Sequence, residues 1–303
     1  MIELNDDKTL FFFDRDLEPV LTVKSGETVR IRTKDCFSNQ LTGPQDTMDD
    51  LDWDAVNPAT GPVFVEGAKA GGALKVRIDN IEFDEQTCSA TGQDEGVCGN
   101  RFTEWATHYC KIQGNTLAWD ERLNIPLRPM IGVIGTAPAE GAPADGFVGN
   151  YGGNMDNKLI TKGTRLYFPV RVPGALLQMG DVHATMGDAE LCGTGIEIAA
   201  QITVRVNVLK NFELHWPVLE TFGPAGKWYV NASAQEYNEA LVCASKEMQR
   251  LLMRITGWDA VETYMYMSVQ SDVEISQGCK PCEVQLSLRI GTPKLTEFPP
   301  LVG

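Results

Sequence analysis

An alternation of apolar and polar residues runs through the first two thirds of the chain and constrains its fold more than any other feature. It is clearest in LEPVLTVKSGETVRIRT at 17–33 and in GIEIAAQITVRVNVLK at 195–210. Residues two apart in a strand share a face, so this period predicts strands with one buried face. Ser25 and Gly26 divide the first segment and predict a hairpin. The pattern favours a mainly β fold of antiparallel strands.

A helical period appears only late in the chain. Ser233 and Glu236 form an S-x-x-E capping box, and apolar residues then recur at helical spacing as far as Ile255. Gly257 is a natural helix end, and Asp259 can cap a second helix. The segment EVQLSLRI, which follows, predicts one more strand.

The length of 303 residues allows two domains or one large domain. The change of pattern predicts a β-rich portion at 1–210 that carries the site, followed by a smaller α+β portion at 211–303. The last strand of the second portion can return to the main sheet. Segment 85–124 is rich in glycine, cysteine and acids, and it predicts an irregular excursion between strands.

Acidic residues outnumber basic ones, 41 against 26, and give a formal net charge of -15. A surface of this sign repels nucleic-acid backbones and anionic membranes, so neither is an expected partner. The first residues, MIELNDDKTL, lack the basic start and apolar stretch of a secretory signal. We therefore expect a soluble cytoplasmic protein.

The chain contains eight cysteines, and without a secretory signal their expected state is the reduced thiol. Cys279 and Cys282 form a C-x-x-C pair, which alone is a weak signal for metal or redox chemistry. Cys88, Cys98 and Cys110 share one irregular segment. A structural metal there is the minor alternative, because their spacing matches no established pattern.

The densest cluster of acids and histidine is GDVHATMGDAE at 180–190. In strands, Asp181 would share a face with His183, and Asp188 with Glu190. If the two halves pair as neighbouring strands, the four side chains converge, as in catalytic metal sites that leave one position for water. The alternative is structural, with each Gly-Asp pair forming a turn and the histidine packed or exposed.

Two further features lie near this cluster in the sequence. Cys192 follows Glu190 by two residues, which permits a scheme with a thiolate nucleophile, although a small buried apolar role is the simpler interpretation. The loop GNYGGNMDN either lends Asn154 and Asp156 to a pocket rim or uses its glycines and asparagines for positive φ angles.

The signature GALLQMGDVHATMGDAELCGTGIE at 174–197 resembles that of the acetamidase/formamidase family. The resemblance extends in the same order over most of residues 17–210. It includes TVRIRTKDCFSNQLT, NPATGPVFVEGAKAG, RPMIGVIGTAP and GGNMDN. The chain departs from the family pattern at Gly72, Val182, Met186 and Ala189, which leaves the identity of the substrate open.

The resemblance implies hydrolysis of a short amide, such as formamide or acetamide, to the carboxylate and ammonia. It also implies a β-sandwich-like fold, a homo-oligomer, and zinc or calcium at the site. The positions that carry over by motif are Asp35, Asp156, Asp181, His183, Asp188 and Glu190.

On this basis we expect Asp35, Asp181 and His183 to bind a divalent metal, most readily zinc. Glu190 would act as the general base, and Asp188 would orient His183 or bridge behind the ligands. Two alternatives stay open at this point. One is a hydrolase of cyclic amides or other C–N bonds, and the other is a noncatalytic β-sandwich module with a structural calcium.

Overall fold

Strands are the main regular structure in the first two thirds of the chain, as the alternating pattern predicts. The computed structural model describes residues 1–279 and 285–303. Its strands up to residue 209 are β1 (Ile2–Leu4), β2 (Thr9–Leu10), β3 (Leu21–Lys24), β4 (Thr28–Thr33), β5 (Ala59–Glu66), β6 (Ala73–Thr91), β7 (Ala106–Gln113), β8 (Thr116–Ala118), β9 (Asn124–Pro126), β10 (Met130–Gly135), β11 (Val148–Gly149), β12 (Gly152–Asn154), β13 (Arg165–Pro169), β14 (Leu177–His183) and β15 (Glu197–Leu209).

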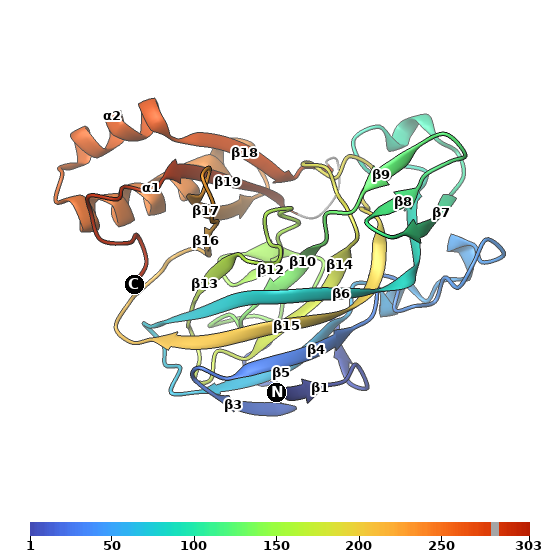
Figure 1. Ribbon diagram of the computed structural model, residues 1–303, viewed down its shortest axis with the longest axis horizontal. Coiled ribbons are helices and arrows are strands. Elements are labelled where there is room, and N and C mark those ends of the chain that lie inside the picture. Colours follow the sequence, from blue (N-terminus) through green and yellow to red (C-terminus); the bar gives the residue numbers. More distant parts are fainter. Residues whose placement is uncertain (280–284) are drawn as a thin grey trace.

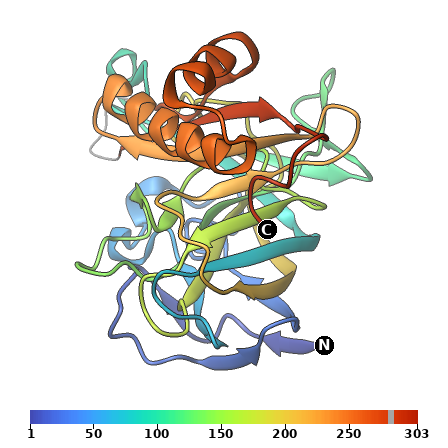
Figure 2. The ribbon, with the colours of Figure 1, turned by 90° about the vertical axis from the view of Figure 1, so that its left-hand side faces the viewer.

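The later part of the chain combines strands with two helices, as expected. These elements are β16 (Val218–Glu220), β17 (Lys227–Ala234), α1 (Tyr237–Thr256), α2 (Ala260–Gln270), β18 (Asp272–Gln277) and β19 (Leu286–Pro293). Figure 1 shows them on one side of the main sheet, and Figure 2 shows both helices stacked beside β17 and β19.

Strand β15 is central to the sheet because three neighbours pair with it. It runs antiparallel to β4 and to β6 along most of its length. Its first residues also pair with the end of β14, with His183 opposite Glu197. The main sheet therefore curls at this junction and continues into a second layer.

The second layer is built around β14, which pairs with β5 on one side and with β10 on the other. In Figure 1 β10 and β14 lie behind β6 and β15, and β5 lies below them beside β4. Side chains from both layers, including Ile31, Ile131 and Ile202, form the main hydrophobic core. Every residue of β14 is buried, so polar side chains on this strand are removed from bulk water.

The sheet also continues across the change of pattern near residue 210. β6 pairs with β13, β13 with β16, β16 with β17, and β17 with β19. Helix α1 packs on β17 and β19 and forms a second hydrophobic core there. The division into portions 1–210 and 211–303 stays a prediction.

Two local predictions are wrong. The segment around Ser25 is not a hairpin, because β3 pairs in parallel with β5 whereas β4 pairs with β15. The amide of Gly26 donates instead to the Val206 carbonyl. The capping box is also wrong, because Ser233 is the residue before the last of β17 and its hydroxyl donates to the Val148 carbonyl.

The helix ends follow the sequence more closely. Gly257 ends α1 with a left-handed φ of 74°. The Asp259 side chain accepts hydrogen bonds from the backbone amides of Val261 and Glu262, and it caps α2 as predicted. Both features are local and depend little on the rest of the fold.

Segment 85–124 is more regular than expected. β6 extends to Thr91 and pairs with β7, which continues into β8 and β9. Cys88 lies on β6 and Cys110 on β7, whereas Cys98 is exposed. No potential metal-binding group in the described ranges includes these three cysteines. Cys282, and with it the C-x-x-C pair, lies outside the described residues.

The lengths and compositions of the two helices show whether either could span a membrane. Within residues 1–279 and 285–303, neither helix combines the length and the apolar character that crossing a bilayer requires.

Asp145 provides a test of the packing because it is 1% exposed in the folded chain. Burial raises the pKa of Asp145 to about 8, and the backbone amide of Ala59 offsets part of this shift. The unfolded chain has an ordinary aspartate pKa of about 3.9. Between these values the folded state binds more protons, so stability falls as pH rises.

We expect Asp145→Asn to reduce this pH dependence. The free energy of unfolding of the wild type should fall between pH 5 and pH 8 more steeply than that of the variant. The difference in slope is at most about 1.4 kcal/mol per pH unit. Urea denaturation at several pH values measures both slopes, and parallel curves would contradict a buried, protonated Asp145.

Candidate active site

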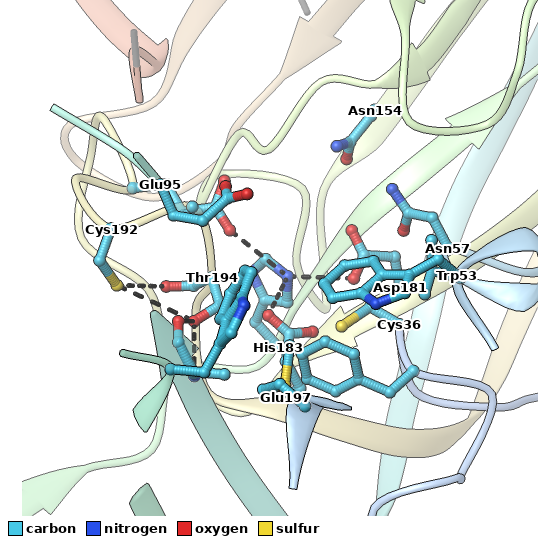
Figure 3. Close-up of a pocket in the computed structure, with 17 residues that line it drawn as sticks. Cys36, Trp53, Asn57, Glu95, Asn154, Asp181, His183, Cys192, Thr194 and Glu197 are labelled. Atoms are coloured by element: carbon cyan, nitrogen blue, oxygen red, sulfur yellow. Dashed lines mark hydrogen bonds and ion pairs between the residues drawn. The ribbon is translucent and has the colours of Figure 1, made fainter. Parts of the chain in front are cut away.

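A small cavity opens where β14, β15 and the loop between them meet the segment after β4 (Figure 3). Its volume is about 150 Å³, well below the roughly 300 to 1,000 Å³ of pockets for drug-sized ligands. Acids and one imidazole line one side. The apolar wall consists of Phe37, Met48, Trp53, Val56 and Trp105. The cavity therefore suits a molecule of a few heavy atoms.

His183 is the centre of the polar side. The Nε2 atom lies 3.2 Å from Asp181 Oδ1 and 3.2 Å from Glu197 Oε1, and Figure 3 shows the imidazole between these two acids. Asp181 and His183 share β14, as the period of two predicts. Glu197 is the cross-strand partner of His183 on β15. Gly195 packs against the ring, because a Cβ there would lie 2.5 Å from His183 Nδ1.

Glu190 reaches the same imidazole by a different route than predicted. The two halves of GDVHATMGDAE do not pair, since Glu190 lies in the loop between β14 and β15. Ala189, just before it, forms an isolated bridge with Gln277. Glu190 Oε1 lies 3.9 Å from His183 Nε2. The tertiary path of the loop, and not strand pairing, brings base and histidine together.

Asp156 completes the group of acids. Gln277, at the end of β18, donates from Nε2 to Asp156 Oδ2 at 2.7 Å and to Glu190 Oε2 at 3.5 Å. Strand β10 comes close at Gly132, where a Cβ would lie 2.4 Å from Asp181 Oδ2 and 2.5 Å from Asp156 Oδ1. Only a glycine at this position leaves both carboxylates in place.

Three of the four acids adopt a left-handed backbone. The φ angles are 40° for Asp156, 51° for Asp181 and 46° for Glu190. Such angles are uncommon for residues other than glycine, and they concentrate at functional sites where the surrounding structure holds the strain. The positive φ expected in the loop GNYGGNMDN is thus present at Asp156, which also faces the other acids.

Burial dominates the electrostatics of the cluster. It raises the pKa of Glu190 to about 8 and that of Glu197 to about 7, although His183 opposes both shifts. Burial and the charge of Glu190 raise the pKa of Asp156 well above its usual range. Burial alone would lower the pKa of His183, but Glu197 and Asp181 raise it well above the ordinary value. The cluster therefore holds protons that a bound cation would displace.

The donor set fits a divalent cation. Bonds of about 2.0–2.2 Å in a tetrahedral site place neighbouring ligand atoms roughly 3.3–3.6 Å apart. The two 3.2 Å separations around His183 Nε2 are close to this range, and the one to Asp181 is also a hydrogen bond. In the described part of the chain, Asp156 Oδ1 and Glu197 Oε2 are buried without a hydrogen-bond partner. Buried acids without partners are costly unless they coordinate metal.

Asp35 lies beside this cluster and outside both potential metal-binding groups in the described residues. Its Oδ1 accepts a hydrogen bond from the Asn39 amide at 2.7 Å, and Asn39 Oδ1 accepts from the Asp35 amide in return. Burial raises the pKa of Asp35 to about 6. The carboxylate shapes the turn after β4, and its role as a ligand stays a prediction.

The contacts recorded for Asp188 in the described residues are with basic side chains and not with His183, so its role toward His183 stays a prediction. Its two oxygens bind Arg289 Nη1 and Nη2 at 3.0 and 2.9 Å, and Lys158 Nζ lies 2.6 Å away. Burial would raise the pKa of Asp188, but the hydrogen bonds from Arg289 and Lys158 lower it. The contacts to His183 come from Asp181 and Glu197, so the geometry assigns Asp188 to anchoring the loop.

Cys192 and Asn154 line the cavity, as the sequence suggested. Cys192 Sγ lies 3.6 Å from the Thr194 carbonyl, and no contact with an acid or a histidine is recorded for this thiol in the described residues. A nucleophilic cysteine needs an adjacent base. The geometry therefore favours the simpler role for Cys192.

Three further residues of the cluster were not predicted from the sequence: Glu197, Gln277 and Cys36. Glu197 is the last residue of the family signature quoted above, so the sequence contained a hint of its role. Its place beside His183 follows only from the cross-strand register of β14 and β15. Cys36 follows Asp35 directly, and Sγ lies within 4.8 Å of an oxygen of Asp181 and one of Glu197. Gln277 is far away in the sequence and carried no signal.

Comparisons with other proteins show the family of the chain. The model of the acetamidase/formamidase family matches residues 4–145 and 148–280. A formamidase from Methylophilus methylotrophus is 27% identical over 256 residues, which are 65% of this chain and 63% of that protein. The chain thus covers less than two thirds of this curated relative.

Two solved structures share the fold over nearly the whole chain. One is a predicted acetamidase/formamidase from Thermoanaerobacter tengcongensis, with a TM-score of 0.92 and 40% identity, covering 96% of this chain and 95% of that one. The other is an acetamidase from Bacillus halodurans, with a TM-score of 0.91 and 38% identity, covering 96% of this chain and 97% of that one.

The anchoring role of Asp188 is testable by stability. Asp188→Asn should lower the free energy of unfolding by about 2 kcal/mol, because a fully buried Arg289 loses a charged partner. Asp272→Asn, which breaks the more exposed pair with Lys227, should cost less than about 1 kcal/mol. Guanidinium denaturation compares them, and equal losses would refute the anchoring role.

Proposed function

This chain belongs to the acetamidase/formamidase family, and we propose that it hydrolyses a short-chain amide to the carboxylate and ammonia with a divalent cation at His183. The observation that carries the proposal is the convergence of Asp181 and Glu197 on His183, with Glu190 only 3.9 Å from the imidazole.

The cavity supports a formamide-type or acetamide-type substrate. Its small volume and apolar wall leave room for a short acyl group. Asn57 Oδ1 and Asn154 Oδ1 are buried without a hydrogen-bond partner among the described residues. They are acceptors, and a primary amide brings N–H donors. A substrate with an unsubstituted amide nitrogen would satisfy both atoms.

His183, Asp181 and Glu197 would hold the cation. A histidine donor favours zinc, because calcium sites use oxygen ligands almost exclusively. When bound, the cation lowers the pKa of water and polarises the substrate carbonyl. This donor set keeps the proposed roles of Asp181 and His183 and replaces Asp35 with Glu197.

Glu190 would act as the proton carrier of the reaction. Amide nitrogen is a poor leaving group until it is protonated, so a base that accepts a proton from the attacking water must return it to nitrogen. Glu190 is 6% exposed, and Gln277 holds its Oε2 while Oε1 faces His183. The apolar wall excludes competing water from this transfer.

The first test is Glu190→Gln, which keeps shape and hydrogen-bond capacity but removes the base. We expect kcat for ammonia release from acetamide or formamide to fall roughly 100-fold to 10,000-fold. The zinc content of the purified variant should equal that of the wild type. A variant with near-normal turnover would remove Glu190 from the mechanism.

Cation removal is the second test. Dialysis against a chelator should abolish ammonia release from formamide and acetamide and lower the melting temperature, because four buried acids lose their counter-charge. Zinc should restore both. Full activity in a protein shown by elemental analysis to be metal-free would refute the cation, and calcium content with no turnover on any amide would favour a binding module.

The cytoplasmic location and the homo-oligomer expected from the sequence stay predictions, as does the absence of nucleic-acid and membrane partners.

A further inference from the structure

The cluster around His183 contains more carboxylates than one divalent cation can neutralise. Asp156, Asp181, Glu190 and Glu197 are each at most 6% exposed. Among the described residues, the ion pairs recorded for these acids involve only His183. Once a cation displaces the protons that this cluster holds, four ionised carboxylates around one neutral imidazole would leave two negative charges after a single divalent cation binds.

The donors also separate into two groups that share no residue. Asp156, His183 and Glu190 offer atoms that all lie within 4.8 Å of one another, and so do Cys36, Asp181 and Glu197. The second group contains the thiol that the proposed reaction does not use. Figure 3 shows Cys36 Sγ directed toward Asp181 and Glu197, on the opposite side of the cavity from Cys192.

An independent observation points to a ligand in the second group. Glu197 Oε1 accepts a hydrogen bond from the Gly195 amide at 2.9 Å and faces His183, whereas Oε2 is buried with no hydrogen-bond partner in the described residues. Glu197 as a whole is 2% exposed. A carboxylate with one oxygen toward His183 and one free oxygen can bridge two cations.

We propose that Cys36 forms a second cation position beside the one at His183, with the Asp181 and Glu197 carboxylates shared between the two positions. The site would then be a dinuclear centre for thiophilic divalent metals such as zinc. The inference rests on the proposed function for the first cation. A thiolate ligand selects zinc or cobalt over magnesium or calcium. Paired cations are an established arrangement in hydrolases, where they stabilise the attacking and leaving oxygens together.

The test uses the full chain loaded with cobalt, without any activity readout. Elemental analysis should give two cobalt ions per wild-type chain, and the absorption spectrum should contain a thiolate-to-cobalt charge-transfer band in the near ultraviolet. Cys36→Ser should bind one cobalt ion and lose the band. Cys192→Ser, the matched control on the other side of the cavity, should retain both.

The outcomes separate this inference from the proposed function. One cobalt ion per chain in both the wild type and Cys36→Ser, with no charge-transfer band, would overturn the second position and leave the first intact. Binding of no cobalt at all would refute both. If Cys36→Ser fails to fold, the wild-type stoichiometry and the spectrum of Cys192→Ser decide. Among the described residues the cysteines that line the cavity are Cys36 and Cys192, so two cobalt ions with a band that survives in Cys192→Ser support Cys36, and one ion without a band overturns the second position.

Discussion

The site depends on one cross-strand pair. Where β14 meets β15, the antiparallel register places His183 opposite Glu197, and directly opposite residues in such a ladder bring their side chains together. Asp181, two residues earlier on β14, reaches the same Nε2 atom. A slip of one residue between these strands would turn the imidazole away from both acids. The curl of the sheet at this junction is therefore a requirement of the chemistry.

The late part of the chain holds the loop between β14 and β15 in place. Glu190 lies in an irregular segment with a left-handed backbone, and β18 and β19 supply several of the contacts that hold this segment. Gln277 binds the Glu190 carboxylate, and the fully buried Arg289 binds Asp188. The helices pack behind these strands. A portion that contributes neither the histidine nor the proposed base thus fixes the geometry of the base.

Local and short-range signals in the sequence predicted much of this correctly. Alternation predicted the strands, the period of two placed Asp181 with His183, and Gly257 and Asp259 marked helix ends. Failures occurred where a distant contact decided the outcome. Ser233 has the spacing of a helix cap, but its hydroxyl donates a hydrogen bond to the Val148 carbonyl instead. Asp188 has the spacing of a site acid, but its carboxylate accepts hydrogen bonds from Arg289, which lies about a hundred residues later in the chain.

The sequence by itself determined the β-rich character, the family, and the candidate site at His183 and nearby acids, because these depend on residue type and on spacing over a few positions. Tertiary structure decided which acids touch the imidazole, and it added Glu197, Gln277 and Cys36 from other segments. The physical reason is that burial and register act between residues far apart in the chain. No short window of sequence records which carboxylate will face a cation and which will face an arginine.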